Sequence, residues 1–172
     1  MIRRIRVAAV LVVAACLGAG LQTPALAAPP TDLCHGGLGH ASDLVYRGVR
    51  VHSALPCQWL DSGRSWYFGN ARLTMQTDGN LVIYDRSDRA RWASNTRGSG
   101  ATQMLFQDDG NLVLYRAGYS AAVWSSRTYN RCTSVYSPTI NLQSDSNYVI
   151  YCRWYRDGGY EMYPIWATGT VF

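Results

Sequence analysis

One nine-residue pattern, Q-x-D-x-N-x-V-x-Y, occurs three times in this chain and constrains its fold more than any other feature. The copies cover residues 76–84, 107–115 and 143–151, and five positions are the same in each. A repeat at this spacing is typical of structural units that bury a core only together, because a single copy is too small to fold alone. We therefore predict three similar units in one domain.

The residues between the repeated positions indicate strands. Side chains of a strand alternate between two faces, so each copy has one apolar face and one face that carries the repeated residues. We expect the repeated residues to lie on one exposed strand face. The predicted core face consists of Met75, Leu81 and Ile83, of Phe106, Leu112 and Leu114, and of Leu142, Tyr148 and Ile150.

The repeated side chains have the chemistry of a sugar site. A carboxylate accepts hydrogen bonds, amides donate and accept, a phenol does either, and a valine can lie against a pyranose ring. Such a site needs no metal and no cofactor. The alternative, that these residues only join hairpins, does not explain their fixed order. The candidate carbohydrate-binding residues are Gln76, Asp78, Asn80, Val82 and Tyr84; Gln107, Asp109, Asn111, Val113 and Tyr115; and Gln143, Asp145, Asn147, Val149 and Tyr151.

With these motifs and the tryptophans that follow them, Trp92, Trp124 and Trp166, residues 42–172 resemble the bulb-type (monocot) mannose-binding lectins, the B-lectin family. The resemblance implies an all-β fold, the β-prism II, in which three four-stranded antiparallel sheets are related by pseudo-threefold symmetry. It implies one mannose at each motif, bound without metal, and tryptophans packed near the symmetry axis. Similar lectins also exchange their C-terminal strand, which implies a possible homodimer through the apolar end of this chain.

The resemblance also implies a role for each repeated residue. In the first copy, Gln76, Asp78 and Asn80 would bind the 2- and 3-hydroxyls of mannose. Val82 would contact the sugar ring, and Tyr84 would bind the 4-hydroxyl. The matching positions of the second and third copies would take the same roles.

The beginning of the chain resembles an export signal. Three arginines, an apolar run and Ala25-Leu26-Ala27 predict a signal peptide over residues 1–27, then an N-terminal extension over 28–41 and the lectin domain over 42–172. The alternative is a lipoprotein signal that anchors the chain through Cys16. The apolar run is too short to span a membrane. The absence of lysine and the alanine-rich leader suggest a bacterial protein.

Charge and cysteine content narrow the function further. Removal of the leader lowers the formal charge from +5 to +2, which argues against nucleic acid as a partner. The other cysteines, Cys34, Cys57, Cys132 and Cys152, are even in number, so disulfides are expected in an exported chain. Of the three possible pairings we favour Cys34–Cys57 and Cys132–Cys152, because each pair is local. The histidines have no zinc-like spacing, and we predict no metal site.

Three segments outside the motifs also yield expectations. Residues 44–51 are predicted to form an opening hairpin. Residues 54–68 are expected to form a disulfide-pinned loop over the core edge, or else an aromatic partner surface. The return after the third motif, 152–165, is the longest and is rich in tyrosine and tryptophan. There Arg153 and Tyr155 would continue the face of Tyr151 and extend the third site, or these aromatics would fill the core or a subunit contact.

The sequence thus favours a secreted lectin for α-mannose or mannose-rich glycans. The alternative is a bacteriocin-like or toxin-like protein that uses the same scaffold to target a cell-surface polysaccharide. An enzyme is a poorer interpretation. Its carboxylate pair would come from Asp78, Asp109, Asp145, Asp157 and Glu161, but the three repeated aspartates should lie on different sheets.

Overall fold

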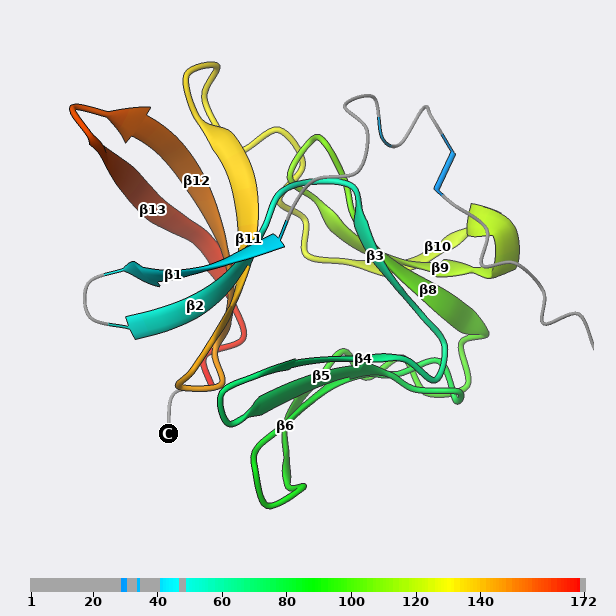
Figure 1. The fold of residues 1–172 in the computed structure, drawn as a ribbon. Coiled ribbons are helices and arrows are strands. Elements are labelled where there is room, and N and C mark those ends of the chain that lie inside the picture. Colours follow the sequence, from blue (N-terminus) through cyan, green and yellow to red (C-terminus); the bar gives the residue numbers. More distant parts are fainter. Residues whose placement is uncertain (1–28, 31–33, 35–40, 47–48, 171–172) are drawn as a thin grey trace, which may run out of the picture.

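The computed structural model describes residues 29–30, 34, 41–46 and 49–170, and Figure 1 shows that these form three β-sheets around a common interior. Sheet A has the order β1-β2-β11-β12-β13, sheet B the order β10-β9-β8-β3, and sheet C the order β4-β5-β6-β7. Every strand pairing within these ranges is antiparallel. The predicted all-β prism of three antiparallel sheets is confirmed, and sheet A has a fifth strand.

The bounds of the elements are as follows. Sheet A contains β1 (Ala41–Tyr46), β2 (Val49–Ala54), β11 (Ser137–Gln143), β12 (Tyr148–Arg156) and β13 (Gly159–Ala167). Sheet B contains β3 (Gln58–Asp61), β8 (Ala101–Phe106), β9 (Leu112–Arg116) and β10 (Ala122–Ser125), with the short 3₁₀ helix η1 (Ala117–Tyr119) after β9. Sheet C contains β4 (Ser65–Phe68), β5 (Ala71–Met75), β6 (Leu81–Tyr84) and β7 (Ala90–Ala93).

Sheet A is built from both ends of the described chain. The predicted opening hairpin is present as β1 and β2, and β2 pairs with β11, so early residues lie beside late ones. Across this junction the hydroxyls of Ser53 and Thr139 are 2.8 Å apart and buried. Sheet C, by contrast, is formed by one continuous stretch of chain.

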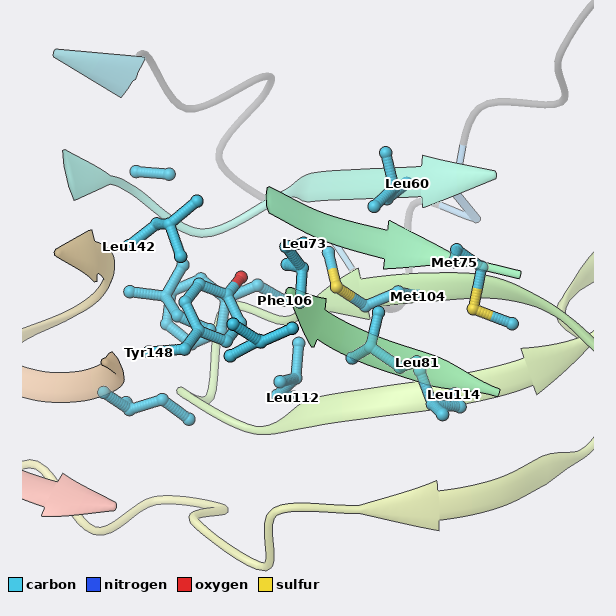
Figure 2. Close-up of a cluster of buried hydrophobic side chains, with 14 of the residues drawn as sticks. Leu60, Leu73, Met75, Leu81, Met104, Phe106, Leu112, Leu114, Leu142 and Tyr148 are labelled. Atoms are coloured by element: carbon cyan, nitrogen blue, oxygen red, sulfur yellow. The ribbon is translucent and has the colours of Figure 1, made fainter. Parts of the chain in front are cut away.

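The inner faces of the three sheets meet in one hydrophobic core, which Figure 2 shows in close-up. All nine predicted core residues are buried, each 1% exposed or less. The rings of Trp92, Trp124 and Trp166, one from each sheet, pack edge to face with centroids 5.8–6.1 Å apart. The expected central tryptophan cluster is therefore confirmed.

The expectation that each motif is one strand is wrong. β5 ends at Met75 and β6 begins at Leu81, and the residues between them form a tight turn. The N–H of Gln76 donates to the carbonyl of Asn80 (2.9 Å), and the N–H of Gly79 donates to the carbonyl of Gln76 (3.1 Å). Gly79 has φ of 90°, which glycine adopts readily. The Asp-Gly pair is a turn signal that overrides the alternating pattern here.

The segment 54–68 is also not the loop that the sequence suggested. It supplies the outer strands β3 and β4, which pair with β8 and β5. Trp66 packs against the main core, whereas Trp59 packs against a second small cluster that includes Leu105 and Val113. These aromatic residues therefore complete two of the sheets, and only Tyr67, 72% exposed, remains on the surface.

Both favoured disulfides, Cys34–Cys57 and Cys132–Cys152, are present. The last described strand, β13, pairs with β12 from Gly159 to Ala167, and the described residues after it, 168–170, are not in a strand. Exchange of a C-terminal strand between subunits stays a prediction. No helix in the described ranges is long and apolar enough to cross a membrane. The predicted signal peptide, Cys16 and the final Val171 and Phe172 lie outside the described residues.

Candidate carbohydrate-binding sites

Each motif forms the hairpin turn between two neighbouring inner strands of one sheet. Site 1 (residues 76–84) joins β5 to β6 in sheet C, site 2 (107–115) joins β8 to β9 in sheet B, and site 3 (143–151) joins β11 to β12 in sheet A. The last four residues of each motif, which include the repeated valine and tyrosine, lie on the second strand, and the repeated aspartate and asparagine lie in the turn before it. The turn thus returns the chain, so that residues separated in sequence come together at one side of each sheet.

The first and last residues of each motif are hydrogen-bonded to each other. Gln76 Nε2 donates to the phenol oxygen of Tyr84 at 2.6 Å. The same bond joins Gln107 to Tyr115 and Gln143 to Tyr151, at 3.0 Å in both cases. A glutamine and a tyrosine held in this way lose side-chain freedom before any ligand arrives, which lowers the entropic cost of binding.

The aspartate of each motif shapes its own turn. Oδ1 of Asp78 accepts a hydrogen bond from the backbone N–H of Asn80 (3.0 Å), as Asp109 does from Asn111 (2.7 Å) and Asp145 does from Asn147 (3.0 Å). These are Asx turns, in which the side chain replaces a backbone acceptor. A carboxylate has two oxygens, so Oδ2 of each aspartate can serve a ligand.

The asparagine is oriented by residues to which the sequence interpretation gave no role. In site 1, Asn80 Oδ1 accepts hydrogen bonds from the hydroxyl of Ser94 and the N–H of Thr96, both at 3.1 Å. With its oxygen engaged, the asparagine presents its Nδ2 as the donor. Thr96 also donates from Oγ1 to the carbonyl of Gly79 (2.7 Å), which fixes the turn itself.

The same clamp recurs in the other two sites. Ser126 and Thr128 orient Asn111, and Thr168 with the N–H of Gly169 orients Asn147. The sequence carries a signal for this clamp, because a serine or threonine follows each tryptophan of the central cluster by two and by four residues.

The repeated valines are buried, although the sequence predicted that all the repeated residues would lie on an exposed face. Val82, Val113 and Val149 are only 2–3% exposed. Val82 lies between Thr74 on β5 and Ala93 on β7, its two cross-strand neighbours. Each valine therefore forms the floor of its site, and only its outermost atoms can contact a sugar.

Arginine side chains flank site 1. The guanidinium of Arg72 lies 4.2 Å from the ring centroid of Tyr84 and donates to Thr74. Arg97 Nε is 3.3 Å from Oδ2 of Asp78 in an ion pair whose members are both accessible to solvent. An exposed pair of this kind is weak, so a ligand hydroxyl can replace it.

Site 2 is the most enclosed of the three. Tyr119 packs edge to face on Tyr115 with centroids 5.6 Å apart, and Trp59 packs against the same cluster. Gln107 and Tyr115 are 6% and 9% exposed, whereas Gln76 and Tyr84 in site 1 are half-buried. Burial raises the pKa of Asp109; the N–H of Asn111 opposes this effect, and the charge of Asp108 adds to it.

The three motif aspartates are not arranged as a catalytic pair. Asp78, Asp109 and Asp145 lie in the turns of three different sheets, so the geometry gives no support to a glycosidase-like site. Among the described residues, Cys34, Cys57 and Asp108 are close enough together to suggest a metal site. Both sulfurs are in a disulfide, however, and zinc requires the thiolate form of cysteine.

Comparison with known proteins agrees with the geometry. The model of the D-mannose binding lectin family (B_lectin) matches residues 67–153. A monomeric mannose-binding lectin from Gastrodia elata is 36% identical; the alignment covers 70% of this chain and 98% of that one, with a TM-score of 0.55. The Polygonatum cyrtonema lectin, solved with a monomannoside, is 33% identical over 63% of this chain and 94% of that one (TM-score 0.51).

The lectin of Remusatia vivipara is 27% identical over 62% of this chain and 93% of that one, with a TM-score of 0.51. No curated protein sequence matches the chain. The matching family consists of carbohydrate-binding lectins rather than enzymes. The family model matches just over half of this chain, and the chain covers nearly the whole of a 36% identical lectin. This chain therefore belongs to the D-mannose binding lectin family.

Proposed function

We propose that this protein is a secreted lectin that binds α-mannose or mannose-rich glycans at sites 1, 2 and 3, without a metal ion. In each site the aspartate and the glutamine would accept from and donate to neighbouring sugar hydroxyls, and the asparagine would donate through Nδ2. The tyrosine hydroxyl would bind a further hydroxyl, with the valine below the ring. The Polygonatum cyrtonema lectin, a structural neighbour, was solved with a monomannoside.

The observation that carries this proposal is the threefold recurrence of one hydrogen-bonded arrangement. The Gln–Tyr bond, the Asx turn and the clamped asparagine occur at each site, with donor–acceptor distances of 2.6–3.2 Å. If these residues only stabilised the hairpin turns, the side chains that do not shape the turn would not need to be the same in all three sites. Here the same donors and acceptors are held in the same positions on three sheets.

Each site is shallow and makes few hydrogen bonds, and each of these replaces a bond to water. We therefore expect millimolar affinity for a single mannose, on the order of −4 kcal/mol. Engagement of two or three sites by a branched glycan or a glycan-coated surface would raise the overall affinity by roughly 10²–10⁴-fold.

The test is a titration of the purified protein with methyl α-mannoside, in which calorimetry and NMR measure the binding. Asp78→Asn keeps the oxygen that accepts from the N–H of Asn80 and changes only the second carboxylate oxygen to an amide. The stoichiometry should fall from three to two while the fold is unchanged. Asp157→Asn is the matched control, because it removes the same charge from an exposed turn outside the motifs.

Unchanged stoichiometry and affinity in Asp78→Asn would refute the site assignment. Binding that is lost in EDTA would refute metal independence. Export belongs to the same proposal: the mature protein should begin at Ala28, and its intact mass will show this. A lipidated product that begins at Cys16 would contradict it.

A further inference from the structure

The hairpin of β12 and β13 is the longest in the described chain. Each strand has nine residues, whereas the corresponding strands in sheets B and C have four or five. In Figure 1 this hairpin extends at the upper left, away from sheets B and C. Asp157 and Gly158, with φ of 51° and 82°, form the two-residue turn at its tip, as is usual for a regular hairpin. Site 3 thus continues into an extension of its strand pair that sites 1 and 2 lack.

The register of this hairpin defines which side chains share the face of site 3. Side chains alternate along β12, so Arg153 and Tyr155 lie on the same face as Tyr151. Directly opposite residues of two strands share a face, and Tyr155 is opposite Tyr160. Trp154 and Tyr163 lie on the other face. The structure is thus compatible with the expectation that Arg153 and Tyr155 continue the face of Tyr151, and it adds Tyr160 to that face.

The two faces of the hairpin are used differently. The back face is packed: Tyr136 contacts Trp154 and Tyr163 with centroids 5.8 and 5.0 Å away. The Cys132–Cys152 disulfide ties the base of β12 to the preceding segment. These contacts attach the back face of the hairpin to the preceding segment.

The front face is open to solvent toward its tip, whereas Met162, opposite Arg153, is buried. Tyr155 and Tyr160 are 61% and 48% exposed, and their rings meet edge to face at 5.1 Å. The guanidinium of Arg153 lies 4.6 Å from the ring centroid of Tyr160. The result is a ridge of aromatic surface with hydrogen-bond donors, which begins at Tyr151 and runs ~13 Å to Tyr155 at the usual rise of a strand. That length accommodates more than one sugar ring.

We propose that Arg153, Tyr155 and Tyr160 form a subsite for a further sugar of a glycan whose terminal mannose occupies site 3. The tyrosine rings would contact the apolar C–H face of that sugar, and the guanidinium would donate to its hydroxyls. This inference rests on the proposed mannose binding. It predicts that site 3 distinguishes disaccharides from mannose, whereas sites 1 and 2 do not.

The experiment uses three full-length proteins, each with one intact site, made by Asp→Asn changes at the other two among Asp78, Asp109 and Asp145. Each protein is titrated with methyl α-mannoside and with α1,2-, α1,3- and α1,6-linked mannobiose. We expect at least one disaccharide to bind the site 3 protein about fivefold or more tightly than the monosaccharide, a gain that the other two proteins do not show.

In the site 3 protein, Tyr155→Ala with Tyr160→Ala should abolish that gain and leave monosaccharide affinity unchanged. Tyr163→Ala, which removes a tyrosine from the back face of the same hairpin, should preserve the gain. A site 3 protein that gains no more than the others, or a gain that survives loss of both front tyrosines, would overturn the subsite. Absence of monosaccharide binding in all three proteins would instead refute the proposed function.

Discussion

Ser146 occupies the turn position that is glycine in the other two motifs, and its replacement by glycine should stabilise the protein. Its φ is 66°, the left-handed region, which costs an L-residue about 1–2 kcal/mol. Its hydroxyl is buried without a hydrogen-bond partner, which costs about 1–3 kcal/mol. Against this, glycine adds unfolded-state entropy worth about 0.5–1 kcal/mol, and the lost methylene contact costs about 0.8 kcal/mol. We expect Ser146→Gly to raise the free energy of unfolding by about 2 kcal/mol.

The reverse change at the equivalent position is the matched comparison. A Cβ on Gly110 would lie 2.9 Å from Cβ of Pro138, and φ there is 81°. Gly110→Ser should therefore destabilise the fold by at least about 2 kcal/mol, since strain and overpacking add. Urea unfolding followed by tryptophan fluorescence measures both variants. If Ser146→Gly leaves stability unchanged or lowers it, the assignment of strain to this turn is wrong.

Three further predictions concern charge and covalent links. Burial raises the pKa of Asp109, and mannose binding needs its carboxylate in the ionised form. A protein that retains only site 2 should therefore lose mannose, as the pH is lowered, at a pH above the ordinary aspartate pKa of ~3.9. An NMR pH titration tests this. Burial would raise the pKa of Asp85, but hydrogen bonds from Arg91 and the local backbone hold it well below its usual range. Its stabilisation is therefore present above about pH 4 and lost as pH falls further, and Asp85→Asn should flatten this loss in acid-dependent unfolding. Serine at both Cys132 and Cys152, which close a loop of 20 residues, should lower unfolding free energy by about 3 kcal/mol in urea titrations; a loss below about 1 kcal/mol would contradict this.

The core was predictable from sequence although the strand interpretation of each motif was wrong. Met75 and Leu81 lie directly opposite each other across the hairpin, and opposite residues share a face. Period-two alternation therefore gives the right inner face whether the five intervening residues are extended or turned. The turn itself had a signal in Asp78 and Gly79, which the longer alternating pattern obscured.

Other features of the sites depend on contacts that sequence spacing does not specify. Trp59 and Tyr119 enclose site 2 because β3 pairs with β8 and η1 follows β9. Trp59 belongs to a segment interrupted by Pro56, Cys57 and Gly63, and these residues favoured a loop over the two short strands observed. The different enclosure of three nearly identical motifs thus arises from their neighbours.

The closure of sheet A by both ends of the chain has a consequence for the order of folding. Sheet C is complete once residue 93 has been synthesised. By contrast, β2 can pair only after β11 has been synthesised, and Ser53 and Thr139, which are in contact across these two strands, are 86 residues apart in the sequence. Closing so long a loop is entropically costly, so sheet A should form last. Removal of either end of the domain opens this same sheet: loss of β1 and β2 would leave β11 as an unpaired edge beside site 3, a template for association with other chains.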